Sequence, residues 1–348
     1  MNWPRLGMNV LTPDLFPFQL TFLVDALLAR RGAEYVSMNM TQSNSLRGVF
    51  VALSTPFNPQ TQEIDASALA AHIDHIIETG IHGLVPGGST GEFTALTIPE
   101  RKCLVELCVK FAGGRVPVVA GVGGLTSRDT LDLAMHAAGA GVTALMVVPP
   151  FYDAVSIPQL HELLGQIRDS TGLPLMYYHI PSATGTKLST EQLAHLSEAG
   201  VRYVKYTSED AIGLMEMLYE RGDSVVTFGG MDTLMFDAVA AGAQGVVWGL
   251  ANVVPDLCLQ FWDAVAVQGD LARGRQLWAK LWPLCKFFES VGYAAAVKTS
   301  MELLGRPTGG MRKPFALLHD VQRIELEKHL VKAGVQTKTQ NGHGDCHR

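Results

Sequence analysis

The feature that most constrains the fold is a regular alternation of short apolar runs with amphipathic stretches, which begins near residue 48 and repeats about every 25 to 30 residues. The apolar runs have the length of buried strands, and the stretches between them have helical spacing. Eight such units with right-handed crossovers close most naturally into a TIM (β/α)8 barrel. We expect its strands over residues 49–54, 82–86, 117–121, 143–148, 174–179, 202–206, 225–228 and 245–249.

Start and stop signals support the helices between these strands. Asp65 and Pro158 stand at expected helix starts, and Gly80 and Gly200 stand at expected helix ends. A doubly wound sheet would be expected to show a GxGxxG phosphate-binding turn after its first strand, where this chain instead has Ser54-Thr-Pro-Phe-Asn58. The pattern therefore favours a closed barrel over an open sheet.

The pattern changes at both ends of the barrel. Helices expected at about 256–268, 270–289, 292–304 and 313–333 form a C-terminal helical extension over residues 255–335, so the barrel itself takes residues 47–254. Residues 336–348 are polar and are expected to be disordered. Residues 1–46 are an N-terminal extension of open role: an arm, a disordered segment, or an artefact of an upstream start with Met38 or Met40 as the true start.

Composition limits the partners. With 348 residues, 47% of them hydrophobic, the chain can bury a large core, and its net charge of −6 comes without a basic stripe, which argues against nucleic acid. The apolar stretch at 15–31 is too interrupted and too charged to span a membrane, so no membrane partner is expected. Five scattered cysteines without a CxxC pair suit a reducing cytoplasm. The terminal motif His343-Gly-Asp-Cys-His347 is interpreted as a polar tail rather than a metal site.

A lone lysine lies in the sixth apolar run, Val201-Arg-Tyr-Val-Lys205-Tyr-Thr207. A free lysine titrates near ~10.4, so about one amine in a few thousand is a neutral nucleophile at pH 7, and burial favours the neutral form. Such an amine can attack a ketone and form a Schiff base, which then draws electrons from a neighbouring bond. The structural alternative is a lysine that reaches solvent from a strand end or pairs with Glu209 or Asp210.

Polar residues also gather where the active site of such a barrel lies, just past the carboxyl ends of the strands. The segments are Gly87-Gly-Ser-Thr-Gly-Glu92 after the second strand, Pro149-Pro-Phe-Tyr152 after the fourth, Tyr178 in the fifth, Lys205 in the sixth and Gly229-Gly-Met-Asp232 after the seventh. Glycines in the first segment let backbone N–H groups point at an anion, and its two hydroxyls can relay protons. Their joint placement favours catalysis.

These motifs, with Tyr178-His-Ile-Pro-Ser-Ala-Thr-Gly185, Val204-Lys-Tyr-Thr207 and Ala241-Gly-Ala-Gln-Gly245, resemble the dihydrodipicolinate synthase and N-acetylneuraminate lyase superfamily of Schiff-base-forming barrels over residues 47 to 335. The resemblance implies that Lys205 forms an imine with pyruvate or a related 2-oxo acid and that the backbone amides of Ser89 and Thr90 hold its carboxylate. It also implies that Tyr178 moves protons together with Thr90 and with Tyr152, which a neighbouring subunit lends, so a homotetramer is expected. No cofactor or metal is implied. We further expect Gly88, Thr207, Gly230, Asp232 and His179 to bind substrate.

Departures from the family patterns bear on the substrate. Dihydrodipicolinate synthases have an arginine for the second substrate where this chain has Ala183, and sialic acid lyases have an acidic residue and a serine at the positions of Thr233 and Gly249. His179 is interpreted either as bound to a backbone carbonyl or as a contact to the distal part of the substrate. Asp232 either caps its helix or binds substrate hydroxyls.

The leading hypothesis is a class I lyase, an aldolase or dehydratase that acts on a 2-oxo-3-deoxy sugar acid or a related 2-oxo acid. The alternative enzyme is 4-hydroxy-tetrahydrodipicolinate (dihydrodipicolinate) synthase, which condenses pyruvate with aspartate semialdehyde, with the missing arginine replaced from elsewhere. An alternative of another class is a non-catalytic barrel that binds a 2-oxo acid. A phosphate-binding isomerase barrel is disfavoured because the loops after the seventh and eighth strands have no GxG phosphate cup.

Overall fold

The computed structural model describes residues 45–338 of the chain. The extension predicted before residue 45 and the terminal motif from His343 lie outside these residues. In the part described, no helix is both long and apolar enough to cross a membrane. The division into a barrel over 47–254 and helices over 255–335 stays a prediction.

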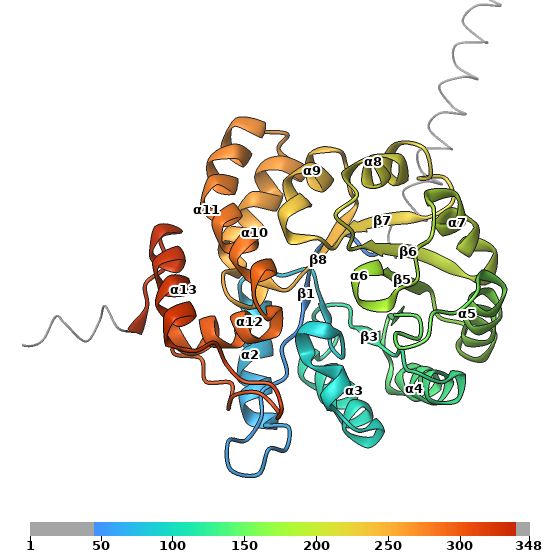
Figure 1. The fold of residues 1–348 in the computed structure, drawn as a ribbon, viewed down its shortest axis with the longest axis horizontal. Helices are drawn as coiled ribbons and strands as arrows, with labels where there is room; N and C mark the ends of the chain where they lie inside the picture. Colours follow the sequence, from blue (N-terminus) through green and yellow to red (C-terminus); the bar gives the residue numbers. More distant parts are fainter. Residues whose placement is uncertain (1–44, 339–348) are drawn as a thin grey trace, which may run out of the picture. The chain divides into compact units, whose positions relative to one another are not determined.

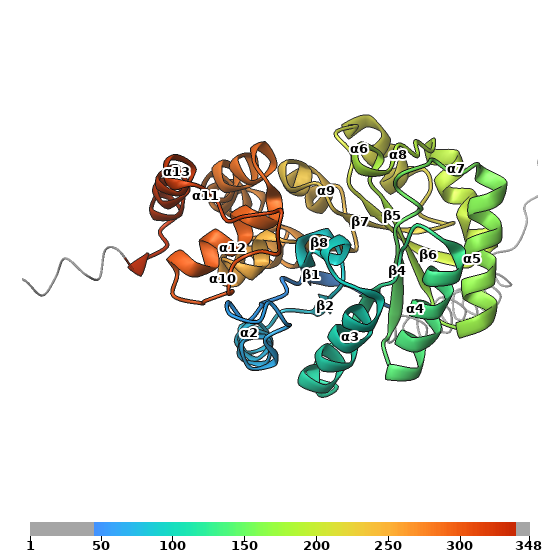
Figure 2. The same ribbon diagram turned by 60° about the horizontal axis from the view of Figure 1, so that its bottom comes forward.

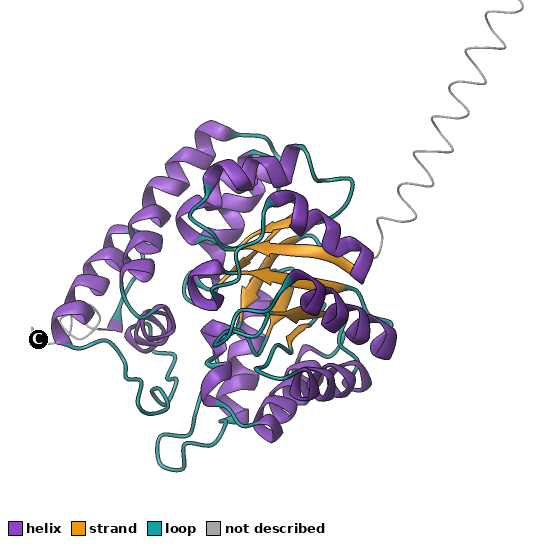
Figure 3. Cartoon of the chain, turned by 45° about the vertical axis from the view of Figure 1, so that its right-hand side comes forward, coloured by secondary structure: helices purple, strands orange, loops and turns teal. Residues whose placement is uncertain are grey.

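Eight parallel strands form the barrel, and their order around the sheet is β2-β1-β8-β7-β6-β5-β4-β3 (Figures 1 and 3). The ring closes between β2 and β3, where Leu84 and Val118 form a parallel bridge. The predicted TIM barrel is confirmed. The strands are β1 Gly48–Ala52, β2 Gly83–Val85, β3 Val119–Gly121, β4 Ala144–Val147, β5 Leu175–His179, β6 Val201–Tyr206, β7 Val226–Gly229 and β8 Gly245–Trp248.

Aromatic rings fill the lower part of the barrel. Phe50 and Tyr203 both meet the ring of Phe228 edge to face, each with 5.7 Å between ring centroids. Glycines leave the space for these rings, since a Cβ at Gly83 would collide with Phe50 and one at Gly245 with Phe228. The barrel interior is therefore a packed core and not an open channel.

Helices surround the strands (Figure 3). Side-chain caps at Asp65, Thr97, Ser156 and Ser189 hold the starts of four of them, and the last three are full capping boxes. The helices between strands are α2 Ala66–Glu78, α3 Ile98–Ala112, α4 Ser127–Ala140, α5 Ile157–Thr171, α6 Pro181–Thr184, α7 Thr190–His195, α8 Ala211–Tyr219 and α9 Met235–Ala240.

The C-terminal helices gather on the side of the barrel that carries β8 and β1 (Figures 1 and 2). They are α10 Pro255–Trp262, continued by a π-helical turn over Asp263–Val267, then α11 Leu271–Ser290, α12 Tyr293–Leu303 and α13 Asp320–Lys332. The helix predicted over 313–333 begins only at Asp320. The preceding segment contains Pro314 and three glycines with left-handed φ angles, which favour turns over helix, at residues 305, 309 and 310.

Candidate active site

A cavity of about 350 Å³ opens at the carboxyl ends of the barrel strands. Residues of the barrel and of the C-terminal helices α11 and α12 line it together. They include Ser89, Thr90, Tyr178, Ser182, Lys205, Thr207, Glu209, Gly230, Asp232, Gly249, Glu289 and Tyr293. Seven of the ten residues that the sequence predicted for the site therefore share one cavity.

Lys205 is a buried basic residue that lines this cavity. It points into the barrel from β6, its residue is 6% exposed, and its register partners are Tyr178 on β5 and Phe228 on β7. Within residues 45–338 no carboxylate lies within 4 Å of its Nζ and no acceptor bonds it; the near group is the Tyr178 ring, whose centroid is 3.9 Å away. The alternative of an ion pair is wrong, because Asp210 caps α8 through the Gly213 N–H instead (2.9 Å).

Two residues shape the wall beside the amine. Gly230 follows β7, and a Cβ there would lie 2.8 Å from Cγ of Lys205 and would also collide with Oγ1 of Thr207. The Thr207 hydroxyl is buried without a hydrogen-bond partner in the described chain. A glycine at 230 thus leaves the lysine side chain room to extend, and Thr207 offers a hydroxyl that a bound molecule can use.

The turn after β2 brings two backbone N–H groups to the cavity. Gly87 has a φ of +72° and its backbone passes so close to Gly121 that a side chain at either position would clash. The following 3₁₀ turn, Ser89–Gly91, is closed by the bond from the Gly91 N–H to the Gly88 carbonyl (3.0 Å). The N–H groups of Ser89 and Thr90 precede this bond and have no acceptor among the described residues, so they are open to an anion.

A carboxylate and a phenol form another part of the cavity lining. The Tyr293 hydroxyl donates to Oδ2 of Asp232 (2.7 Å), and Glu289 accepts a hydrogen bond from the Thr233 N–H (3.1 Å). Burial, with a smaller contribution from Glu289, raises the pKa of Asp232 to about 7. Asp232 therefore does not cap its helix, as one interpretation of the sequence had it; it lies in the cavity wall.

Three predicted site residues lie elsewhere. His179 points to the outer face of β5, where its ring stacks on Tyr206 (5.2 Å between centroids) and its Nδ1 has no partner in residues 45–338. The prediction that His179 binds substrate is wrong for this reason, since side chains alternate along a strand and Tyr178 takes the inner face. Burial lowers the pKa of His179 to about 4. Gly88 supports the turn through its carbonyl, and Tyr152 is 87% exposed outside the cavity.

Sequence reasoning missed four polar lining residues, Ser182, Glu209, Glu289 and Tyr293. The last two come from the end of α11 and the start of α12, helices that were expected to cover the barrel rather than to enter its site. One signal was available: Gly249 follows β8 and admits the ring of Tyr293, because a Cβ at 249 would lie 2.6 Å from the phenol oxygen.

A (β/α)8 barrel with a buried lysine beside a tyrosine at the carboxyl ends of its strands has the groups that an enzyme of the Schiff-base class requires. The sequence model of the Dihydrodipicolinate synthetase family matches residues 45–333. The chain belongs to this family, as its motifs predicted, and is a class I lyase.

Curated relatives agree with the assignment. The 4-hydroxy-tetrahydrodipicolinate synthase of Nitrobacter hamburgensis is 35% identical over 298 residues, which cover 85% of this chain and 99% of that protein. The enzyme of the same name from Thermomicrobium roseum is 37% identical over 282 residues, which cover 81% of this chain and 92% of the relative.

Solved structures share the fold. Dihydrodipicolinate synthase from Aquifex aeolicus superimposes with a TM-score of 0.79 at 28% identity and covers 84% of this chain and 99% of its own. YagE, a prophage protein of E. coli K12 from the dihydrodipicolinic acid synthase family that was solved in complex with pyruvate, gives a TM-score of 0.79 at 26% identity, with 83% and 99% covered.

Proposed function

We propose that Lys205 forms an imine with a pyruvate-derived 2-oxo acid. The observation that carries this proposal is the amine itself, which is buried, has no carboxylate within 4 Å in the described chain and lies 3.9 Å from the centroid of the Tyr178 ring. A buried lysine without a partner is costly unless the site uses its amine. The open N–H groups of Ser89 and Thr90 line the same cavity and suit the carboxylate of such a substrate.

The chemistry needs no further cofactor. The amine adds to the ketone, water leaves, and the iminium that results withdraws electrons from the carbon next to it. In an aldol cleavage a base takes the proton of the C4 hydroxyl, the electron pair of the bond between C3 and C4 moves into the iminium, and an aldehyde leaves. The enamine that remains takes a proton at C3, and water then hydrolyses the imine and releases pyruvate. Tyr178, whose ring lies beside the amine, acts as the proton carrier in this proposal, together with the hydroxyl of Thr90 in the same cavity.

Tyr152 completes this relay from a neighbouring subunit in our proposal. Its side chain is 87% exposed and does not line the cavity of its own chain, as expected of a residue used across an interface. We therefore propose a homotetramer. We also propose that the enzyme works in the cytoplasm, since Cys103, Cys108, Cys258 and Cys285 are free thiols.

The favoured substrate is a 2-oxo-3-deoxy sugar acid. The second candidate is the condensation of pyruvate with aspartate semialdehyde, which the names of the relatives support. That reaction brings a second carboxylate into the site, whereas Ala183 is exposed on α6 and no arginine is among the described residues that line the cavity. A barrel that only binds 2-oxo acids is disfavoured, because binding alone gives no reason to bury an unpaired amine beside a phenol.

The test is to trap the imine. The protein is incubated with pyruvate and borohydride, and the reduced adduct is located by peptide mapping. We expect a pyruvyl adduct on Lys205 and none in Lys205→Ala. Lys298 is the matched internal control, since it is also buried but is held by Glu92. A wild-type protein that forms no adduct with pyruvate or with longer 2-oxo acids would refute the proposal.

A further inference from the structure

Glu289 and Tyr293 of the C-terminal helices, together with Asp232, form one wall of the cavity, which we call the distal wall. This wall carries negative charge. Glu289, at the end of α11, lines the cavity and uses one oxygen, Oε1, to accept from the Thr233 N–H (3.1 Å). Its other oxygen has no hydrogen-bond partner in residues 45–338. Tyr293, at the start of α12, has its hydroxyl engaged by Asp232 (2.7 Å), so this phenol has no proton left to offer a ligand.

The charges around the cavity do not balance. Three carboxylates line it, from Glu209, Asp232 and Glu289, and the one basic side chain among the described lining residues is Lys205. Lys205 is itself more than nine-tenths buried, is aimed into the cavity and lacks a protein partner, so the structure points to a ligand here on independent grounds. Once an iminium forms, its charge is matched by the carboxylate of the 2-oxo acid. The distal wall then stays negative.

This negative wall determines what can lie against it. A second carboxylate at the far end of the substrate would meet like charges inside a partly desolvated cavity, which is unfavourable. A hydroxyl, an ammonium or a guanidinium would instead donate to the open oxygen of Glu289. Burial raises the pKa of Asp232 to about 7, and a cationic or donating neighbour would favour its ionised form.

We propose that Glu289 and Asp232 recognise the end of the substrate remote from the 2-oxo acid, and that this end is a hydrogen-bond donor without negative charge. The inference rests on the proposed function, since it takes the 2-oxo acid to be bound at Lys205. It adds to that function a role for the C-terminal helices, which select the substrate. It also excludes a dicarboxylic substrate.

The test compares three 2-oxo acids that differ in their far ends: 2-oxoadipate with a carboxylate, 2-oxo-3-deoxygluconate with hydroxyls and 2-oxo-5-guanidinopentanoate with a cation. The readout is the concentration that gives half-maximal borohydride-trapped adduct on Lys205, relative to pyruvate in the same protein. We expect the hydroxylated or the cationic acid to trap at a concentration at least tenfold lower than 2-oxoadipate does. Comparing the hydroxylated acid with the cationic acid shows which hydrogen-bond donor the distal wall prefers.

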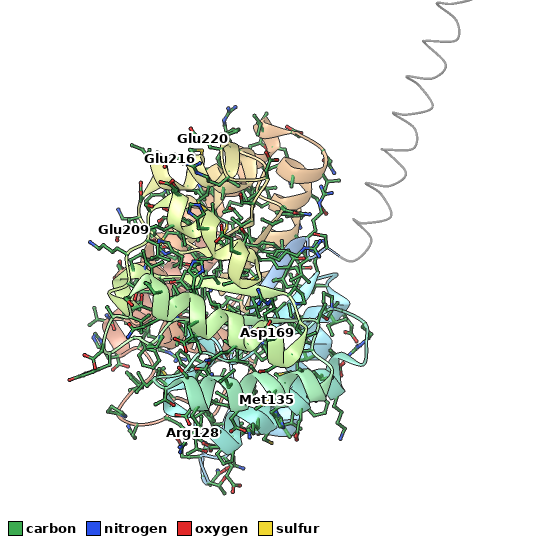
Figure 4. All side chains as sticks on the ribbon, turned by 90° about the vertical axis from the view of Figure 1, so that its right-hand side faces the viewer. Arg128, Met135, Asp169, Glu209, Glu216 and Glu220 are labelled. Atoms are coloured by element: carbon green, nitrogen blue, oxygen red, sulfur yellow. The ribbon has the colours of Figure 1, made fainter. Side chains whose placement is uncertain are left out.

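The variant Glu289→Gln tests the residue. Glutamine keeps an acceptor for the Thr233 N–H, so a purely capping role predicts no change, whereas the proposal predicts that the preference against 2-oxoadipate shrinks at least fivefold. Glu220→Gln is the matched control; Glu220 follows α8 at the end opposite Glu209 (Figure 4), outside the cavity lining, and its loss should leave the preference unchanged.

The outcomes separate the two proposals. If pyruvate forms no adduct on Lys205, the proposed function fails. If pyruvate is trapped but 2-oxoadipate is trapped as well as the other two acids, or if Glu289→Gln leaves the preference as it was, the inference on the distal wall is overturned and the proposed function stands.

Discussion

Glu92 and Lys298 form a buried ion pair that joins the cavity turn to helix α12. Nζ of Lys298 lies 2.5 Å from Oε1 of Glu92, and the two side chains are 0% and 3% exposed. Glu92 adopts a left-handed conformation with φ of +57°, and Lys298 also donates to the Gly310 carbonyl (2.8 Å). The ion pair therefore anchors the turn that carries Ser89 and Thr90 to helix α12.

We expect Lys298→Met to destabilise the protein by about 3 to 5 kcal/mol, because it leaves the Glu92 carboxylate buried and unpaired. The same change should raise the pyruvate concentration needed for half-maximal trapping, since the turn loses an anchor. Adding Glu92→Gln should recover at least half of the lost stability, because no buried charge then remains. Chemical unfolding measures the first effect and borohydride trapping the second.

Lys102→Met is the control for this prediction. It removes the ion pair of Lys102 with Asp132 (2.7 Å), whose side chains are 27% and 47% exposed, and an exposed pair contributes about 1 kcal/mol or less. If the two methionine variants lose equal stability, or if trapping by Lys298→Met matches wild type, the ion pair does not hold the turn.

Tyr178→Phe should slow proton transfer at C3 of bound pyruvate by about 10²- to 10⁴-fold, the usual contribution of a positioned acid–base group. The measurement is the exchange of the pyruvate methyl protons with deuterated solvent, followed by NMR. Tyr177→Phe is a close control, because Tyr177 precedes Tyr178 but points to the outer face, where its buried hydroxyl has no partner in the described chain. Equal exchange rates in the two variants would remove Tyr178 from the proton relay.

Asp232→Asn should make the protein more stable at neutral and higher pH. Burial raises the pKa of Asp232 to about 7, so the folded state holds a proton that the unfolded state releases near pH 4. Stability from this group is thus full below about pH 4 and is lost as the pH rises through 7. One pKa unit corresponds to about 1.4 kcal/mol, so at pH 8 the free energy of unfolding of the wild type should be lower than that of the variant by a few kcal/mol.

The measurement is thermal or chemical unfolding of both proteins between pH 4 and pH 8. Other groups, such as the buried His72, titrate alike in the two proteins, so their contributions cancel in the difference. A difference that does not change with pH would show that Asp232 is not the titrating group.

Local patterns were enough to predict the barrel and the position of Lys205 inside it. The strand carrying Lys205 had to be buried on both faces, and the two-residue period placed Lys205 inside and Tyr206 outside, as the structure shows. The same period places His179 outside, opposite to Tyr178. The prediction that His179 binds substrate failed there.

Contacts between distant segments were out of reach of the sequence. Nothing near Glu289 or Tyr293 indicates that the junction of α11 and α12 enters the cavity, because that placement depends on how the C-terminal helices pack against β8 and β1. The bond between Tyr293 and Asp232 joins residues 61 positions apart. Tyr293, unlike Asp232, lies in no motif that marks it, so only the assembled fold brings the two together.

Gly249→Ala tests this junction, because Gly249 is where the barrel admits the ring of Tyr293. Its φ is −75°, which alanine adopts freely, so any cost comes from the clash of the new Cβ with the ring, 2.6 Å from the phenol oxygen. We expect a loss of about 1 to 3 kcal/mol, typical of overpacking, and displacement of Tyr293 from Asp232. The preference of the cavity among 2-oxo acids should weaken with it.

Gly165→Ala in α5 provides the comparison, since a Cβ there meets nothing within 4 Å and alanine should stabilise the helix by roughly 0.5 to 1 kcal/mol. Adding Tyr293→Ala to Gly249→Ala removes the clashing ring, so the second change should cost less in that background than it does alone. Chemical unfolding of the wild type, Gly249→Ala, Tyr293→Ala and the double variant measures the coupling between the two changes. If the costs of the two changes simply add, Tyr293 does not occupy the space that Gly249 leaves, and the distal wall is built differently.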